Sequence, residues 1–284
     1  MKALDFITEM CRLADLGQGS KNAYSTEAQC LASGRFALKL IAEPKDGKLE
    51  STKIDVLESF GFRVVEAKVV AGSFGYQITV EGPEDIDLGA ETDLRRFAVE
   101  EGLFGGTYCS EESVASECLR GVSFKGFDMG QIKLHPKLKL AADFRGCHRF
   151  AAALEHVNPA EAILTGEQIA ILWGWAEQGK KGREILEAIA ARENCPLDLL
   201  MAGFDRAIGQ EHSWNATGMF TALVCRKNLP PELKKKFTEA GAQLHRFLSD
   251  VIDIEGINAE LRSILVGQRM ALAGPEWAHL KPAS

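Results

Sequence analysis

The stretch that most constrains the fold runs from Pro230 to Gly256. Proline suits the first turn of a helix, where no N–H is needed, and glycine commonly ends one. Between them seven apolar residues alternate steps of four and three, which places them along one side of a helix. The pattern predicts a single amphipathic helix roughly 35 Å long with one buried side. The seven residues are Leu233, Phe237, Ala240, Leu244, Phe247, Val251 and Ile254.

The sequence before this stretch is also helical in pattern, from about residue 150 onward. Thr165 followed by Gln168 is a capping box, which marks a helix start. Residues 196–208 carry a second apolar stripe at helical spacing. The connections are short, so neighbouring helices should run antiparallel in a bundle or a helical array. We therefore expect a helical domain over residues 151–284.

Two of the expected helix starts have similar sequences, a similarity that we call the echo. Residues 191–200 and 225–234 align at an offset of 34, with an asparagine turn, a proline and an acidic residue in each. A step of this size is typical of a two-helix repeat, so the pattern resembles α-helical repeat proteins, although it matches no particular repeat family. Helix starts also look alike by themselves, so the echo leaves open whether a true repeat is present.

The N-terminal part has a different pattern. Residues 62–70 and 76–82 are rich in β-branched and aromatic residues and are separated by a short glycine-containing loop, which predicts a β-hairpin over 62–82. Helices are expected over 3–16, 26–44 and 53–59. The sequence thus predicts an α+β fold with an α/β part over 1–85. A connecting region over 86–150 follows, in which residues 122–127 and 131–140 alternate like strands that could continue the sheet.

Composition narrows the class of protein. The 284 residues are 46% hydrophobic and carry a formal charge of −7, which argues against a chain devoted to binding nucleic acid. No apolar run approaches the length of a membrane span, and the N-terminus lacks the pattern of a signal peptide. The seven cysteines are scattered without a CxxC motif, so we expect reduced thiols and a cytoplasmic protein. No sequence pattern points to a cofactor, and no cysteine and histidine spacing fits a common metal site.

One cysteine stands in a basic setting that suits chemistry. Cys147 and His148 lie between Arg145 and Arg149, and nearby positive charge lowers the pKa of a thiol that is exposed to solvent. A nucleophilic cysteine also needs a base, which a histidine could supply. These two residues are therefore the candidate catalytic pair of an alternative hypothesis, a cysteine-dependent enzyme.

A second alternative rests on the order of elements in residues 26–82. A helix followed by a hairpin resembles a winged helix-turn-helix, in which basic side chains meet DNA phosphates. Asp55 and Glu58 oppose this resemblance, because they stand where a recognition helix would carry basic or amide groups. The positive charge available to such a DNA-binding regulator comes from Lys48, Lys53, Arg63 and Lys68.

The leading hypothesis is a non-enzymatic protein-interaction or regulatory protein whose helical half binds another protein or a second copy of itself. Tryptophan is enriched at binding hot spots, which makes Trp173, Trp175 and Trp214 candidates for the binding face. Residues 234–236 are the other candidates, because three lysines at a helix start oppose the helix dipole. The partner-binding set is Trp173, Trp175, Trp214, Lys234, Lys235 and Lys236.

Overall fold

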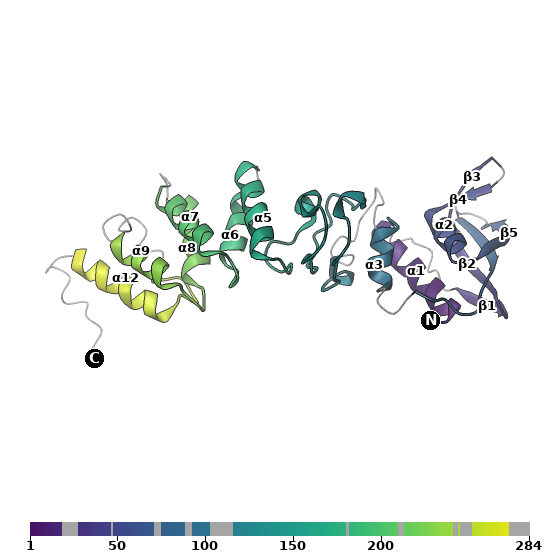
Figure 1. The fold of residues 1–284 in the computed structure, drawn as a ribbon, viewed down its shortest axis with the longest axis horizontal. Helices are drawn as coiled ribbons and strands as arrows, with labels where there is room; N and C mark the ends of the chain where they lie inside the picture. The colour runs from purple at the N-terminus through teal and green to yellow at the C-terminus, as the bar shows by residue number, and fades with distance from the viewer. Residues whose placement is uncertain are drawn as a thin grey trace. The chain divides into compact units, whose positions relative to one another are not determined.

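The computed structural model describes residues 1–18, 28–46, 48–70, 75–88, 93–102, 116–179, 182–209, 213–240, 244 and 252–272. The chain divides into two compact units, residues 1–163 and 164–284. The first unit holds a small antiparallel sheet, helices and a coil of chain, and the second unit is helical (Figure 1). The α+β class expected from the sequence is confirmed.

A four-stranded antiparallel sheet forms the N-terminal part, in the order β1-β2-β6-β5. The hairpin predicted over 62–82 is confirmed as β5 and β6, which pair antiparallel with a bulge at Val65. A second, two-stranded sheet joins β3 to β4. The strands are β1 (Gln29–Ala32), β2 (Arg35–Ile41), β3 (Glu43–Lys45), β4 (Lys48–Glu50), β5 (Arg63–Val69) and β6 (Gly75–Glu81).

Three helices accompany this sheet: α1 (Ala3–Gln18), α2 (Thr52–Ser59) and α3 (Leu94–Glu100). The side chains of Ser51 and Asp93 cap α2 and α3 by accepting hydrogen bonds from backbone N–H groups of the first turn. Phe60 links the helices, because its ring lies 4.7 Å from that of Phe6 in α1 and 5.2 Å from that of Phe97 in α3. The apolar core of this part also includes Ile7, Met10, Leu38, Leu40, Ile54, Leu57, Ile78 and Val80.

The helix expected over residues 26–44 is wrong. The described residues of that range form β1, β2 and the start of β3. Phe36, Leu38 and Leu40 lie on one face of β2 and are buried, as is Ala37, whereas Arg35 and Lys39 on the other face are exposed. Pairing of the whole of β2 with β6 therefore overrides the local helix signal.

Residues 116–163 form a coil of successive turns that the sequence patterns did not predict. Its chain makes successive turns that lie side by side (Figure 1). Parallel bridges join Ser123 to Asp143, Asp143 to Ile163, and Asp128 to His148, and each bridge links residues twenty apart in sequence. The strands expected over 122–127 and 131–140 are wrong, because these residues form single bridges and turns rather than continuous strands.

A five-residue step underlies the first turn of the coil. Leu119, Phe124 and Met129 are buried at that spacing. Glycine follows two residues after the first two of them, at Gly121 (φ 73°) and Gly126 (φ 74°), where the chain changes direction in a conformation that favours glycine. The interior is filled by phenylalanine rings that pack at tilted or edge-on angles, with centroids 5.4–5.8 Å apart. These rings belong to Phe124, Phe127, Phe144 and Phe150.

The second unit consists of helices that pack against one another. α5 packs with α6 and α7 with α8, while α6 also contacts α7 and α8, and α9 contacts α12. One aromatic core runs through it, since the ring of Phe204 in α7 lies 4.7 Å from Phe237 in α9 and 6.1 Å from Phe220 in α8. The helices are α5 (Gly166–Gln178), α6 (Gly182–Ala190), α7 (Leu197–Ile208), α8 (Ser213–Val224), α9 (Pro231–Glu239) and α12 (Ala259–Leu272).

The single long helix expected over 230–256 is also wrong. α9 begins at Pro231 as expected but ends at Glu239, with Ala240 as its C-cap. The next residue in sequence is Gly241, and glycine is among the poorest residues for a helix interior. Residues 241–243 and 245–251 lie outside the described part of the chain. Gly256 lies in a turn with φ 80°, and the last described helical residue before it is Ile252.

Candidate functional site

The turns between successive helix pairs of the second unit are held together by polar side chains. Arg226, which follows α8, is 3% exposed. One of its guanidinium nitrogens donates to the carbonyls of Ala190 (2.6 Å) and Arg192 (2.5 Å), and another donates to the carbonyl of Glu193 (3.1 Å). The carbonyl of Ala190 is the last of α6, where carbonyls have no partner within the helix, and those of Arg192 and Glu193 lie in the turn that follows. Arg226 thus caps the preceding turn, about one repeat earlier in the chain.

Asparagines extend the same arrangement along the unit. The side-chain amide of Asn194 donates to the carbonyl of Leu164. That of Asn258 donates to the carbonyls of Arg226 and Lys227, while its oxygen accepts from the first turn of α12. The backbone N–H of Asn258 also donates to Val224, which lies 34 residues earlier. Turns that follow one another in sequence are therefore stacked in space.

The 34-residue echo in the sequence corresponds to equivalent positions in this stack. Pro196 and Pro230 are the N-caps of α7 and α9, with φ −56°, ψ 143° and φ −58°, ψ 141° respectively. Lys227 donates its backbone N–H to the carboxylate of Glu193, again 34 residues away. The echo therefore marks two copies of one helix start, so the second unit is a helical repeat array.

The three lysines at the start of α9 have partners within the second unit. Lys234 pairs with Glu260 of α12, and Lys236 pairs with Asp205 of α7. Lys235 lies 3.6 Å from Glu239 on its own helix and its side chain is 75% exposed. Carboxylates on the two neighbouring helices thus balance the charge that opposes the dipole of α9.

The three candidate tryptophans fall in different settings. Trp173 is 3% exposed and belongs to the core, where its ring lies against Gly203 of α7. Trp175 is half-buried on α5. Trp214 falls in α8, but its side chain lies outside the described residues. Only Trp175 is therefore placed by the structure where a partner could reach it.

Trp175 shares one side of α5 with two other residues. Ile171 lies one turn earlier and is 39% exposed, which is high for a large apolar side chain. Between them is Gly174, where an added Cβ would meet nothing within 4 Å. We call Ile171, Gly174 and Trp175 the α5 strip. It is a smooth, partly apolar surface on the first helix of the array.

The structure opposes the activated thiol expected at Cys147. Cys147 is half-buried and His148 is exposed in the coil. Arg145 and Arg149 are paired with carboxylates. Arg145 forms two hydrogen bonds with Asp143, and Arg149 forms two with Asp128. Burial raises the pKa of the Cys147 thiol, and the expected lowering is wrong.

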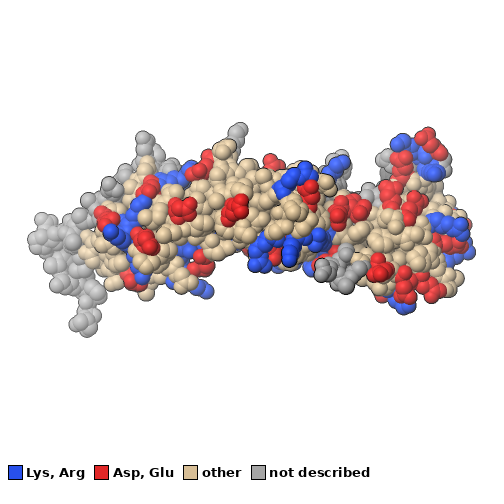
Figure 2. Space-filling model, viewed as in Figure 1, with Lys and Arg blue, Asp and Glu red and all other residues tan. Residues whose placement is uncertain are grey.

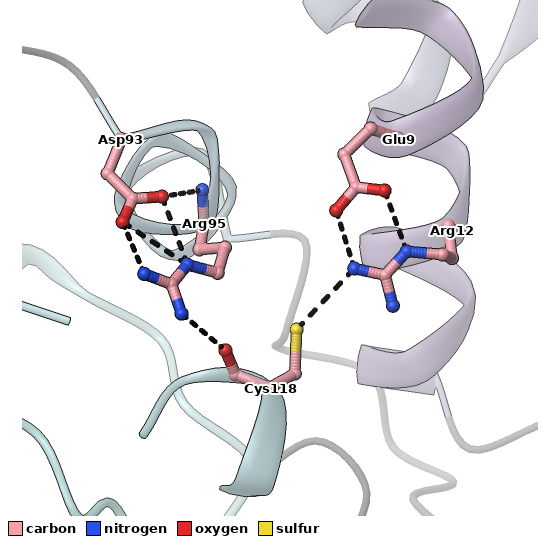
Figure 3. A network of polar contacts seen from close by, with 5 residues as sticks. All are labelled: Glu9, Arg12, Asp93, Arg95 and Cys118. Atoms are coloured by element: carbon pink, nitrogen blue, oxygen red, sulfur yellow. Dashed lines mark hydrogen bonds and ion pairs between the residues drawn. The ribbon is translucent and has the colours of Figure 1, made fainter. Parts of the chain in front are cut away.

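A polar cluster ties the coil to the helices of the first unit (Figure 3). Arg12 of α1 is held by Glu9 and lies 3.8 Å from the sulfur of Cys118, while Arg95 of α3 donates to the carbonyl of Cys118 at 3.2 Å. Burial opposes ionisation of Asp93, but hydrogen bonds from Arg95 lower its pKa overall. Each guanidinium is already matched by a carboxylate, so the cluster serves to join α1, α3 and residues 116–118.

Within the described ranges, no three His, Cys, Asp or Glu side chains gather closely enough to hold a metal ion. The six described cysteines form no disulfide, and Cys109 lies outside the described residues. None of the helices in these ranges combines the length and apolar character that crossing a bilayer requires.

Comparison with protein-family models, with curated proteins and with solved structures finds no match to this chain.

Sequence reasoning missed two of the residues that organise the second unit. These are Arg226, which lies within the 225–234 copy of the echo, and Asn258. Asn258 could have been found, because it precedes α12 just as Asn194 and Asn228 precede the prolines of the other helix starts.

Proposed function

We propose that this chain is a non-enzymatic protein-interaction or regulatory protein whose helical unit binds a partner protein. The observation that carries the proposal is the stacking of helix pairs through Arg226 and Asn258. Arrays of stacked helical repeats present extended surfaces that other proteins use for binding. The scattered cysteines, without a disulfide among those described, favour the cytoplasm as the setting.

The α5 strip is the surface that best suits this role. Large side chains that are apolar and rigid supply most of the energy at protein interfaces. Trp175 and Ile171 provide such side chains one turn apart, and Gly174 lets a partner approach the helix between them. Lys235 can add positive charge elsewhere on the array, whereas Lys234 and Lys236 serve chiefly to join α9 to its neighbours.

The two alternative functions receive less support. A winged helix-turn-helix needs a helix before α2, and the described residues of 28–46 form strands instead. Lys53, one of the basic residues that it would use, is 5% exposed. A cysteine-dependent enzyme needs a thiolate at neutral pH, which burial of Cys147 disfavours.

A substitution at Gly174 tests the proposal without disturbing the core. Gly174→Gln adds bulk in open space on the α5 strip, and Gly174→Ala is the matched control. Tagged full-length protein and both variants would be used to capture proteins from the source cell, with quantification by mass spectrometry. We expect a partner that is captured by the wild type and the alanine variant but is lost with glutamine. Equal recovery of every captured protein by all three forms would contradict the α5 strip as the binding surface.

A further inference from the structure

The four-stranded sheet of the first unit ends in a strand with an open edge. Among the described strands, β5 pairs with β6 alone and stands last in the strand order (Figure 1). Six of its seven residues are exposed, and Val64 is half-buried. The strand at the other edge, β1, is four residues long, so β5 is the longer of the two edges. An exposed edge offers backbone N–H and C=O groups that can pair with a further strand.

The backbone of β5 points alternately toward β6 and away from it. Val70, directly after β5, donates its N–H to the carbonyl of Gly75 at 2.9 Å. Opposite residues of an antiparallel pair alternate between hydrogen-bonded and non-hydrogen-bonded positions. Val69 and Ala67 lie one and three residues before Val70, so they occupy non-hydrogen-bonded positions relative to β6. Their N–H and C=O groups therefore point toward the open edge.

The two sides of β5 differ in character. Ala67 stands opposite Ile78 of β6 and so lies on the core side of the sheet, yet Ala67 is exposed whereas Ile78 is fully buried. Val69 follows on the same side and is 68% exposed. Glu66 and Lys68 lie on the other side, where their charged groups are 2.7 Å apart and their side chains are 49% and 70% exposed. The core side of the sheet thus reaches an uncovered apolar edge, with a charged pair on its reverse.

We propose that β5 pairs antiparallel with β5 of a second copy of this chain, across a two-fold axis at Ala67. The outward backbone groups of Ala67 then meet those of the same residue in the second copy. Glu66 of each copy lies opposite Lys68 of the other, and Val65 of each lies opposite Val69 of the other. Opposite charges and apolar side chains that face each other across strands stabilise an antiparallel pair. The pairing joins the two four-stranded sheets into one.

The order of residues in β5 favours a second copy over an unrelated strand. A two-fold interface must be complementary to itself, and the segment from Val65 to Val69 has this property about Ala67, with a valine at each end and charges of opposite sign between. An axis at Glu66 or at Lys68 would instead set like charges directly opposite, which is destabilising. An edge lysine and a bulge, here at Val65, discourage indiscriminate pairing. One register of self-pairing still matches every charge.

Overall charge sets the conditions of the test. The chain carries a net charge of −7, so association is measured at about 0.15 M salt, where distant charges are screened. Figure 2 shows Lys and Arg interspersed with Asp and Glu over the sheet part, so the face seen there carries no single sign of charge. Two paired strands bury less surface than a standard interface, and we expect a reversible dimer of the full-length protein with a Kd of about 10–300 µM. Sedimentation velocity at increasing protein concentration measures it.

Charge reversal tests the pairing between copies. Glu66→Lys and Lys68→Glu each set like charges opposite one another at two places, so each variant should dimerise roughly tenfold more weakly or worse. An equimolar mixture of the two variants should recover association, because every lysine at these positions then faces a glutamate of the other variant. The two substitutions change the net charge in opposite directions, so a loss in both is not an effect of overall charge. Lys39→Glu on the exposed side of β2 is the control and should stay within about twofold of the wild type.

Crosslinking through cysteine tests the register. Directly opposite residues in a hydrogen-bonded antiparallel position have Cα atoms about 5.5 Å apart, so a short thiol crosslinker should link Ala67→Cys to its copy. Val69→Cys is the matched control, because the two introduced thiols would be offset by four residues along the strand, more than about 10 Å. Mass spectrometry of the linked peptides separates these links from any through native cysteines such as the exposed Cys30.

The outcomes bear on β5 independently of the α5 strip, which belongs to the other unit. A wild type that stays monomeric at all concentrations would overturn the proposal. So would dimerisation that both charge variants leave unchanged, a mixture that fails to recover association, or equal crosslinking of the two cysteine variants. Circular dichroism checks folding, and if charge reversal disrupts the sheet the cysteine pair decides alone.

Discussion

Replacing Arg226 tests whether the helical unit depends on the stacking of its turns. In Arg226→Met, a side chain of similar length fills the space but donates nothing to the carbonyls of Ala190, Arg192 and Glu193. Removing a charged donor lowers the free energy of unfolding by about 1.5–3 kcal/mol per hydrogen bond. The variant also no longer buries a charge, and the desolvation cost that is removed offsets part of this loss. The Nε group of Arg226 is buried without a hydrogen-bond partner, which adds to that relief. We expect a net loss of about 3 kcal/mol in the free energy of unfolding of this unit.

Tryptophan fluorescence is a suitable readout because all four tryptophans lie in residues 164–284. Unfolding in urea followed by this signal reports the helical unit separately from the first unit. A loss of about 3 kcal/mol corresponds to a fall in Tm of roughly 10 °C for a unit of this size. The free energy of unfolding of Arg226→Lys should lie between those of the wild type and Arg226→Met, since an ammonium cannot reach three carbonyls with the geometry of a guanidinium.

Arg206→Met is the matched control, because Arg206 lies on α7 with its side chain 44% exposed and its guanidinium 3.8 Å from the carboxylate of Glu177. This control substitution should lower the free energy of unfolding by less than about 0.5 kcal/mol. If Arg226→Met unfolds at the same urea concentration as the control, the stacked turns contribute little and the reasoning is wrong. A large loss in both variants would also refute it, because it would point to a general sensitivity to charge.

Three further predictions concern other parts of the molecule. Gly182→Ala should destabilise the helical unit by more than about 1 kcal/mol, because the added Cβ would lie 1.8 Å from a backbone oxygen. Gly174→Ala should instead stabilise the unit by up to about 1 kcal/mol. Urea unfolding compares the two variants, and equal effects on the free energy of unfolding would argue against the α5–α6 geometry. Burial lowers the pKa of His156 in the folded state, so the neutral imidazole contributes stability above the unfolded-state pKa of about 6.5. That contribution is lost as the pH falls through the folded-state pKa. His156→Gln should therefore flatten the pH dependence of Tm on the acid side, and an unchanged profile would contradict this. Because burial raises the pKa of Cys147, iodoacetamide should label it more slowly than the exposed Cys30 at neutral pH, as measured by mass spectrometry, and faster labelling of Cys147 would revive the enzyme hypothesis.

The sequence predicted elements well where local pattern and tertiary packing agree. The hairpin over 62–82 and the helix beginning at Thr165 combine a clear period with turn or capping residues, and both are confirmed. The segment 26–44 was misread because its leucines fit a helix as readily as a strand. Only pairing of β2 with β6 decides between them, and that contact is between residues about forty apart in sequence.

The coil could have been found from the sequence with a different search. Helix and strand periods do not describe it, because its buried residues recur every five positions, at Leu119, Phe124 and Met129. Glycines two residues after the first two of them complete the signal. Leu134 is only half-buried and Lys139 is exposed before the buried series resumes at Phe144, so a short window of sequence hides the period.

The candidate site was only partly readable. Trp173, Trp175 and the three lysines were correctly placed on helices, but exposure depends on how the helices pack. Trp173 and Trp175 are two positions apart, so they point to different sides of α5, and the sequence does not indicate which side meets α7. Nor do local charges reveal that Lys234 and Lys236 meet carboxylates of α12 and α7, because those partners are distant in sequence.

Hydrogen–deuterium exchange of the full-length protein tests the central claim, that the helical array binds a partner through the α5 strip. Exchange would be measured by mass spectrometry with and without the captured partner, at saturating concentration. The account predicts slower exchange in peptides covering α5, around Ile171 and Trp175, in the complex. Protection confined to the sheet of the first unit, with exchange in α5 unchanged, would contradict it.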